Sequence, residues 1–164
     1  MYMNNPEENV DCRGRRLADR PLTVADVMTR YVITLNPHHS FSDSVSLMAK
    51  HSFRHFLVVD ETGRLVGVVS DRDILRVLAR TNHWNTTSVS QFMTHDVMTV
   101  KPNTGLSVVV GKMLSKRVNC LPVVDEDNNL QGILTSTDLL KTFRSVQESL
   151  EKAAKCFKDA SVKV

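Results

Sequence analysis

The sequence contains an internal duplication: shifted by 65 positions, residues 24–78 align with residues 89–143 without a gap. Seventeen of these 55 aligned positions carry the same residue, far more than unrelated sequences of this composition would share. Two copies are too few for a solenoid, which needs at least about three repeats to bury a continuous core. The duplication therefore predicts one pseudo-symmetric unit built from two similar halves.

Each copy shows the same order of hydrophobic periodicities. A short β-rich run ends at a proline, a stretch with apolar residues at helical spacing follows, and two β-rich runs flank a turn before a final helical stretch. Gly63 and Asn128 stand at equivalent places in these turns, and both tolerate a positive φ. Ser40 and Asp43 predict a capping box at the first helix. The expected elements are residues 32–35, 41–48, 56–59, 65–69 and 71–78 in the first copy and 97–100, 106–113, 121–124, 130–134 and 136–143 in the second.

A single unit of this size cannot bury both faces of its sheet. We therefore expect an α+β fold in which two β-α-β-β-α repeats pack together with pseudo-two-fold symmetry. The segments would be a disordered tail at 1–20, repeats at 21–80 and 89–144, a linker at 81–88, and a C-terminal helix and tail at 145–164. The C-terminal helix carries an apolar stripe that needs a partner, either on its own module or on another subunit.

Composition narrows the class of protein. Of the 164 residues, 41% are hydrophobic and 24% are charged, and the formal net charge is +3. A protein that binds nucleic acid through phosphate contacts alone is usually more basic. No run of about 18 apolar residues predicts a membrane span, and residues 1–20 lack the apolar segment of a secretory signal. Three widely spaced cysteines match neither a disulfide framework nor a zinc pattern, so we expect a cytoplasmic protein with reduced thiols.

The strongest sign of ligand chemistry lies where the last strand of each copy meets the last helix. There a glycine precedes a hydroxyl side chain by three residues, and an aspartate follows three residues later. Free N–H groups at a helix N-terminus attract phosphate, and the hydroxyl adds a donor. The aspartate would repel phosphate, but it can accept both hydrogen bonds of a ribose cis-diol. The residues are Gly67, Ser70 and Asp73 in the first copy and Gly132, Thr135 and Asp138 in the second.

The same spacing has a second explanation. A Ser or Thr followed three residues later by Asp, just before an apolar run, is also a capping box that satisfies N–H groups at the start of a helix. A duplication preserves a cap as readily as a binding site. The two interpretations are compatible, because a hydroxyl can cap the ligand-free helix and meet phosphate in the complex.

The order, spacing and duplication of these motifs resemble a tandem pair of cystathionine-β-synthase (CBS) domains over about residues 22–144. The resemblance implies two β-α-β-β-α units packed through their sheets, with adenosine-containing ligands in the clefts between them. AMP, ADP or ATP are the implied ligands, S-adenosylmethionine and NAD are further candidates, and no cofactor is required. It also implies that two modules pair into a disc-shaped homodimer. The matching segments are Asp26-Val-Met-Thr29, Pro37, Phe56-Leu-Val-Val-Asp60 and Gly67 to Asp73, then Gln91-Phe-Met-Thr94, Pro102, Leu121-Pro-Val-Val-Asp125 and Gly132 to Asp138.

The resemblance also implies roles for individual residues. Asp73 and Asp138 match the ribose-binding acid of the family, and Ser70 and Thr135 match its phosphate-facing hydroxyl. Strands of the opposite copy usually hold the adenine. That implies a cleft formed with Asp138 by Ile33, Thr34, Arg54 and His55, and a cleft formed with Asp73 by Met98, Thr99, Asn119 and Cys120.

Two departures from the family pattern make the copies unequal. Leu57 replaces the proline that stands at Pro122, so the entrance to that strand is expected to differ. Arg72 and Thr137 stand where some family members place a phosphate contact, and only the first of them is basic. We therefore expect the two clefts to bind with unequal affinities.

Other candidate sites are weaker. The segment from Gly105 to Lys112 resembles a P-loop only in part and falls on an expected helix. His38 and His39 follow a proline and favour a solvated loop over a metal site, so no metal is expected. Trp84 in the linker is equally suited to cover a cleft or to pack on the surface. No nucleophile–base pair can be assembled from local motifs, so we do not expect an enzyme.

We therefore expect a regulatory module that binds adenine nucleotides and signals by conformational change, to an unidentified protein target or within a homodimer. Two alternatives stay open. The first is a structural or interaction module with vestigial clefts. The second is a nucleic-acid binder that uses an arginine-rich arm within residues 1–20, although neither nucleic acid nor membrane is an expected partner.

Overall fold

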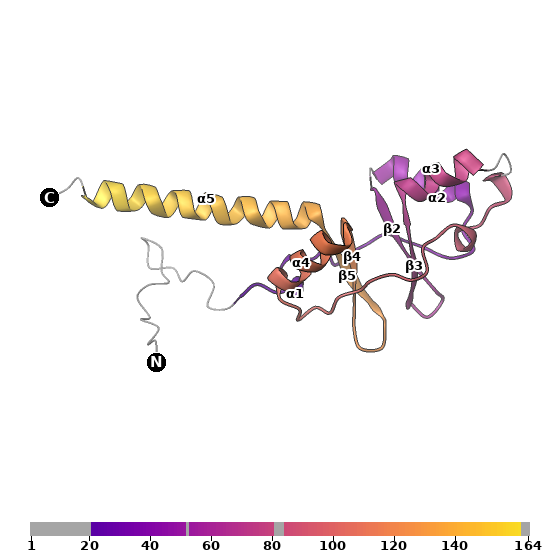
Figure 1. Ribbon diagram of the computed structural model, residues 1–164, viewed down its shortest axis with the longest axis horizontal. Coiled ribbons are helices and arrows are strands. Elements are labelled where there is room, and N and C mark those ends of the chain that lie inside the picture. Colours follow the sequence, from indigo (N-terminus) through magenta and orange to yellow (C-terminus); the bar gives the residue numbers. More distant parts are fainter. Residues whose placement is uncertain (1–20, 52, 81–83, 162–164) are drawn as a thin grey trace.

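The computed structural model describes residues 21–51, 53–80 and 84–161, so the expected disordered tail at 1–20 lies outside the described residues. Two α+β units lie side by side, and a long C-terminal helix extends away from them (Figure 1). The α+β class and the two repeats of strands and helices that the duplication predicts are confirmed.

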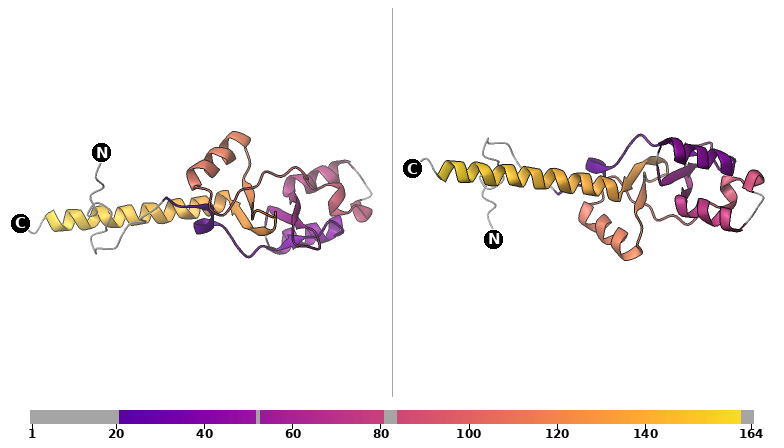
Figure 2. Two further views of the ribbon diagram at one scale, coloured as in Figure 1. Left: turned by 90° about the horizontal axis from the view of Figure 1, so that it is seen from below. Right: turned by 90° about the horizontal axis from the view of Figure 1, so that it is seen from above.

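The first unit holds a three-stranded sheet with two helices on one side of it (Figures 1 and 2). Its strands run in the order β1-β2-β3, with β1 parallel to β2 and β2 antiparallel to β3. The apolar spacing predicts the helices but only part of their buried faces. In α2 Phe41 is buried as expected, whereas Val45 is exposed; in α3 Ile74 and Val77 are buried, whereas Leu75 and Leu78 are exposed. The elements are β1 (Thr34–Leu35), α2 (Phe41–His51), β2 (His55–Val59), β3 (Leu65–Ser70) and α3 (Asp71–Arg80).

The second unit repeats this arrangement with one difference. The strand expected at 97–100 is reduced to a single parallel bridge between Val100 and Val123. Pro122 stands where the first unit has Leu57, which pairs with β1, and a proline offers no N–H to extend such a ladder. The elements are α4 (Leu106–Lys116), β4 (Cys120–Val124), β5 (Leu130–Thr135) and α5 (Ser136–Ser161), and β4 and β5 form a two-stranded antiparallel sheet.

The predicted turns and the predicted cap of α2 are confirmed. Gly63 and Asn128 adopt φ values of 81° and 66° in the two hairpin turns. One carboxylate oxygen of Asp43 accepts hydrogen bonds from the Ser40 N–H at 2.9 Å and from its hydroxyl at 2.8 Å. The Ser40 hydroxyl in turn accepts the Asp43 N–H at 3.1 Å. This capping box lines neither cleft described below and is therefore a reference for the two that do.

The segment that leads into each unit packs in the core of the other unit. Val24 of α1 (Val24–Val27) is fully buried in the apolar cluster of the second unit, beside Val109. Val89 of η2 (Val89–Gln91) is fully buried in the cluster of the first unit, beside Phe41. Each half of the duplication thus completes the core of the other half.

A third apolar cluster joins the two sheets. It includes Val68 of β3 together with Val124 and Ile133 of the second unit, all buried. Two short antiparallel bridges tie the lead-in segments to this region, one between Thr29 and Ile133 and the other between Thr94 and Val68. The lead-in backbones therefore run directly beside the strands that carry the hydroxyl-x-x-Asp motifs.

The structure shows no break in the helix at residue 145, where the sequence predicts the boundary between the second repeat and the C-terminal helix. The last helix of the second unit and the C-terminal helix form one continuous helix of 26 residues, α5. Neither Gly nor Pro interrupts the sequence between Ser136 and Ser161, so nothing in it breaks the helix. Figure 2 shows α5 extending well beyond the two units.

The linker packs on the first unit. Trp84 lies in η1 (Trp84–Thr86), and its ring centroid is 5.9 Å from that of Phe41. Its ring therefore packs on the surface of the first unit, one of the two roles that the sequence leaves open for it. Residues 81–83 of the expected linker lie outside the described residues. Within the described ranges, no helix is long and apolar enough to cross a membrane.

Candidate functional site

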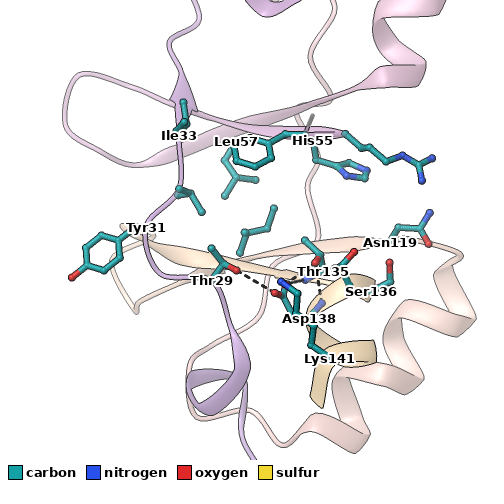
Figure 3. A pocket seen from close by; sticks show the side chains of 15 residues that line it. Thr29, Tyr31, Ile33, His55, Leu57, Asn119, Thr135, Ser136, Asp138 and Lys141 are labelled. Carbon is teal, nitrogen blue, oxygen red and sulfur yellow. Dashed lines mark hydrogen bonds between the residues drawn. The ribbon is translucent and has the colours of Figure 1, made fainter. Parts of the chain in front are cut away.

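Two clefts open at the junction of the units, each beside one of the hydroxyl-x-x-Asp motifs. The larger, which we call the Asp138 cleft, has a volume of about 350 Å³. Figure 3 shows Asp138, Thr135 and Thr29 on one side of it, facing Ile33, Leu57 and His55 on the other. Its lining residues are Thr29, Tyr31, Val32, Ile33, Phe53, Arg54, His55, Leu57, Asn119, Ile133, Thr135, Ser136, Thr137, Asp138 and Lys141.

The second cleft, which we call the Asp73 cleft, has a volume of about 220 Å³. Three arginines and three aspartates line it, so their formal charges sum to zero, and no Phe, Tyr or Trp lines it. Two such rings line the Asp138 cleft, those of Tyr31 and Phe53. The lining residues of the Asp73 cleft are Arg54, His55, Val68, Ser70, Asp71, Arg72, Asp73, Thr94, Asp96, Val97, Met98, Arg117, Val118, Asn119, Cys120, Leu121 and Pro122.

Both hydroxyl-x-x-Asp motifs form capping boxes. Oδ2 of Asp138 accepts the Thr135 N–H at 2.8 Å and the Thr135 hydroxyl at 2.6 Å. Oδ2 of Asp73 accepts the Ser70 N–H at 2.8 Å and the Ser70 hydroxyl at 2.6 Å. Both carboxylates are buried. One oxygen of each aspartate therefore serves the helix start, and Oδ1 is the oxygen that differs between the clefts.

Oδ1 of the two aspartates meets different donors. Oδ1 of Asp138 accepts a hydrogen bond from the Thr29 hydroxyl at 3.1 Å, so its donor is uncharged and the hydrogen bond is long (Figure 3). Oδ1 of Asp73 accepts Nη1 of Arg76 at 2.7 Å in an ion pair within α3. A ligand hydroxyl can displace an uncharged donor from a carboxylate oxygen, or share that oxygen with it, more easily than it can displace a charged donor. The Asp138 carboxylate is thus the more readily available of the two.

The glycine that precedes each motif is required by packing between the two halves of the duplication. A Cβ added to Gly132 would lie 2.5 Å from the Thr29 carbonyl oxygen. A Cβ added to Gly67 would lie 2.7 Å from Sδ of Met93 and 3.0 Å from the Thr94 carbonyl oxygen. The close neighbour of each glycine is therefore the lead-in segment of the opposite half.

Three residues line both clefts: Arg54, His55 and Asn119. Nε of Arg54 lies 3.1 Å from Oδ2 of Asp71, which lines only the Asp73 cleft. In the second unit the residues at the positions of Arg54 and Asp71 are Asn119 and Ser136, which carry no charge. The shared wall is therefore charged on the side of the first unit and neutral on the other.

The residues at equivalent positions 55 and 120 are both uncharged at neutral pH, for the same physical reason. Burial lowers the pKa of His55, an effect that the nearby Asp71 carboxylate opposes. Burial raises the pKa of the Cys120 thiol to about 11. The neutral imidazole and the protonated thiol can each contact an uncharged ring without a desolvation penalty for charge.

Most of the residues that sequence reasoning assigned to each cleft do line it. Thr34 and Thr99 are the exceptions. Thr34 lies instead in a shallower hollow with Val59 and Leu130, and Thr99 is half-buried away from the Asp73 cleft. The correctly placed residues are Ile33, Arg54, His55, Thr135, Thr137 and Asp138 in one cleft and Ser70, Arg72, Asp73, Met98, Asn119 and Cys120 in the other.

Sequence reasoning missed the lead-in residues of both clefts. Thr29 and Tyr31 line the Asp138 cleft, and Thr94 and Asp96, at the equivalent positions, line the Asp73 cleft. Thr29 and Thr94 are among the identical pairs of the duplication, and this identity was the available signal. Lys141 of α5 was also missed, although it stands one turn after Asp138 on the same helix.

Comparison with known proteins agrees with this architecture. The family model described as CBS domain matches residues 24–80 and again residues 89–145. An L-aspartate semialdehyde sulfurtransferase of Methanocaldococcus jannaschii is 31% identical over 140 residues, which cover 83% of this chain but 27% of that protein. The chain spans between about a quarter and a half of the length of the first curated relatives that it matches.

Three solved structures match the fold over most of the chain. The AcuB protein of Vibrio cholerae has 32% sequence identity and a TM-score of 0.75, covering 81% of this chain and 98% of its own. The CBS domain pair of MJ0100, solved with 5-methylthioadenosine and S-adenosyl-L-methionine, has 29% identity and a TM-score of 0.70, covering 77% and 98%. CBSX2, solved with AMP, has 29% identity and a TM-score of 0.68, covering 76% and 98%. With two matched domains, one in each half of the duplication, the chain belongs to the CBS domain family.

Proposed function

We propose that this protein is a regulatory module that binds adenosine-containing nucleotides in its two clefts and signals by changing the relative position of its two units. The observation that carries the proposal is the paired geometry of Asp138 and Asp73. Each stands at the start of a helix, is buried in a cleft, and faces residues from the opposite unit. The known ligands of the matched structures, AMP in CBSX2 and S-adenosylmethionine in MJ0100, support an adenosine group.

We assign the ribose to Oδ1 of Asp138 and the phosphate to the start of α5. Of the first N–H groups of this helix, that of Ser136 donates to the Asn119 carbonyl at 2.9 Å, and that of Asp138 faces the Thr135 hydroxyl at 3.3 Å. The Thr137 N–H is the backbone donor that we assign to a phosphate oxygen. Arg54 and Lys141, which line the same cleft, supply positive charge for it.

The Asp138 cleft is the tighter site in this proposal. It is the larger of the two, it offers the rings of Tyr31 and Phe53 to an adenine, and its basic side chains outnumber its acidic ones. In the Asp73 cleft a ribose competes with Arg76 for the carboxylate, and Asp71 and Asp96 oppose a phosphate. AMP, ADP and ATP are the proposed ligands, with S-adenosylmethionine and NAD as further candidates.

The output of such a module is conformational. A ligand in either cleft contacts residues of both units, so it favours the arrangement of units in which those contacts are made together. The module would comprise residues 21–80 and 89–144, act in the cytoplasm on an unidentified protein target, and work as a homodimer. We propose no catalytic role: Cys120 and His55 line the same cleft, but burial raises the pKa of the thiol to about 11, which keeps it protonated and a poor nucleophile. The relatives with enzyme names match this chain over only about a quarter of their length.

A thermal-shift panel with AMP, ADP, ATP, NAD and S-adenosylmethionine tests the proposal. A ligand at 100 times its Kd adds about 2.7 kcal/mol to the free energy of unfolding. For a chain of this size that corresponds to a rise in Tm of roughly 5–11 °C. GMP and ribose 5-phosphate serve as controls for the base and for the phosphate alone. If no adenosine ligand moves Tm by about a degree at millimolar concentration, the clefts are vestigial and the module serves structure or protein interaction.

A further inference from the structure

The outer part of α5 presents a long apolar face that the two units leave uncovered. The helix extends away from both units in every view (Figures 1 and 2). Every described side chain from Phe143 to Lys155 is exposed, and Phe143, Val146 and Leu150 expose 63%, 46% and 52% of their surface. Helices in proteins gain most of their stability from packing an apolar face and not from intrinsic propensity. The outer part of α5 therefore needs a partner surface.

The spacing of the apolar residues identifies the kind of partner. From Phe143 onward, apolar residues recur at alternating steps of three and four residues, as the a and d positions of a heptad do. A repeat of 3.5 residues stays on one face of a helix only when the helix supercoils around another helix. The residues of this seam, read from the sequence, are Phe143, Val146, Leu150, Ala153 and Phe157. Leu139, four residues before Phe143, packs against the core of the second unit.

None of the charged residues of α5 falls at a seam position. With Phe143 at position a, every charged residue of the helix falls at positions b, c or f, on the opposite side. There Arg144 and Glu148 form an ion pair at 3.5 Å. The positions that flank the seam, e and g, are all uncharged. The charged residues are Asp138, Lys141, Arg144, Glu148, Glu151, Lys152, Lys155, Lys158 and Asp159.

We propose that the α5 helices of two copies of this chain pair along the seam as a coiled coil. Charged e and g positions are what usually select a different partner or exclude a second copy, and this helix has none. The seam is therefore complementary to itself. At its base it continues into an apolar hollow of about 480 Å³ between α4 and α5, lined by Leu106 and Val110 among others, which extends the surface available to the second helix. This pairing specifies one contact of the homodimer in the proposed function, and its test does not depend on nucleotide binding.

Hydrogen exchange and light scattering on the purified full chain test the pairing. In the wild type, the amides of residues 144–155 should become more protected as protein concentration rises. Leu150→Glu places a charge in the seam and should reduce that protection and weaken association by at least about tenfold. Ser145→Glu places the same charge at position c, on the outer face, and should leave both unchanged. Leu150→Ala, which adds no charge, should give a smaller loss of protection.

Three outcomes would overturn the proposal. The first is rapid exchange of these amides in the wild type at every concentration, as expected if another protein covers the helix in the cell. The second is protection that does not depend on concentration, as expected if a segment of the same chain covers it. The third is equal behaviour of Leu150→Glu and Ser145→Glu. The Tm of the two CBS units, measured for each variant, separates loss of pairing from loss of folding.

Discussion

The two clefts share a backbone plan but differ in the side chains around the carboxylate. Both place an aspartate in a capping box with hydrogen bonds of equal length, 2.8 and 2.6 Å, to the preceding hydroxyl residue. Beyond that box, Asp138 meets a neutral threonine from the opposite half, whereas Asp73 meets an arginine of its own helix. The capping box at the helix start is therefore the same in both halves, and the contacts of the other carboxylate oxygen, Oδ1, differ. We therefore expect the two halves to respond differently to equivalent substitutions.

The largest contrast is expected in stability at the paired glycines. Gly132→Ala brings a Cβ against the Thr29 carbonyl oxygen at 2.5 Å, and backbone cannot move aside cheaply. Gly67→Ala meets Sδ of Met93 first, at 2.7 Å, and a methionine side chain can rearrange. We expect losses of about 3 kcal/mol for Gly132→Ala and about 1–2 kcal/mol for Gly67→Ala. Denaturant unfolding measures both, and equal or reversed losses would contradict the geometry.

The Cys120 thiol should be unreactive. Burial raises its pKa to about 11 from an ordinary value of 9.0, which reduces its thiolate fraction at pH 8 by about 100-fold. Alkylation by iodoacetamide, followed at this residue by mass spectrometry, should be slower than that of glutathione by about the same factor. A nucleotide in the Asp73 cleft should slow it further, since Cys120 lines that cleft alone. Reaction at the rate of free glutathione would refute the buried environment.

Arg76 and Lys141 occupy equivalent positions, and their substitution should change ligand affinity in opposite directions. Arg76 occupies Oδ1 of Asp73, so Arg76→Gln should free that oxygen and raise the affinity of the Asp73 cleft by about threefold, as for an exposed ion pair. Lys141 lines the Asp138 cleft and supplies charge for the phosphate, so Lys141→Gln should lower affinity there by a similar factor. Calorimetric titration of the two variants tests this. A loss of affinity in both would mean that Arg76 contacts the ligand.

The smallest effect concerns pH. The pKa of His55 is lowered in the folded state by burial, so below its unfolded pKa of about 6.5 the unfolded chain binds a proton that the folded chain does not. The free energy of unfolding should therefore fall as pH decreases from 7 through this range and level off below the folded pKa. His55→Gln should flatten this slope. Cys120→Ser, at the equivalent position, should leave it unchanged, and a slope that persists in His55→Gln would assign it to other groups.

Local features of the fold were predictable because neighbouring residues determine them. The positive φ of Gly63 and Asn128 follows from residue type and turn position, and the Ser40–Asp43 cap follows from spacing. Within the candidate site, the two hydroxyl-x-x-Asp motifs were predictable for the same reason. The loss of the strand before α4 was only partly predictable, because it depends on Pro122 lacking an N–H toward a partner strand.

The exchange of lead-in segments was not predictable from patterns along the chain. Val24 is buried in the second unit and Val89 in the first, although each lies closer in sequence to its own unit. Hydrophobic periodicity indicates which face of a helix or strand is apolar, but it does not indicate which of the two cores that face packs into. For this reason Thr29 was missed, although its hydroxyl is the cross-unit contact of Asp138. The duplication alone would have paired it with Thr94 and indicated that both matter.

Calorimetric titration with the best nucleotide of the panel tests the central claim, that Asp138 and Asp73 hold ribose in two unequal clefts. In Asp138→Asn the tighter site should weaken by about 10- to 100-fold, because an amide cannot accept two charge-assisted hydrogen bonds. Asp73→Asn should weaken only the second site. Asp43→Asn, which alters a capping box outside both clefts, should lower stability and leave binding unchanged. If Asp138→Asn and Asp73→Asn lose only stability, as Asp43→Asn should, the two aspartates are helix caps and the account is wrong.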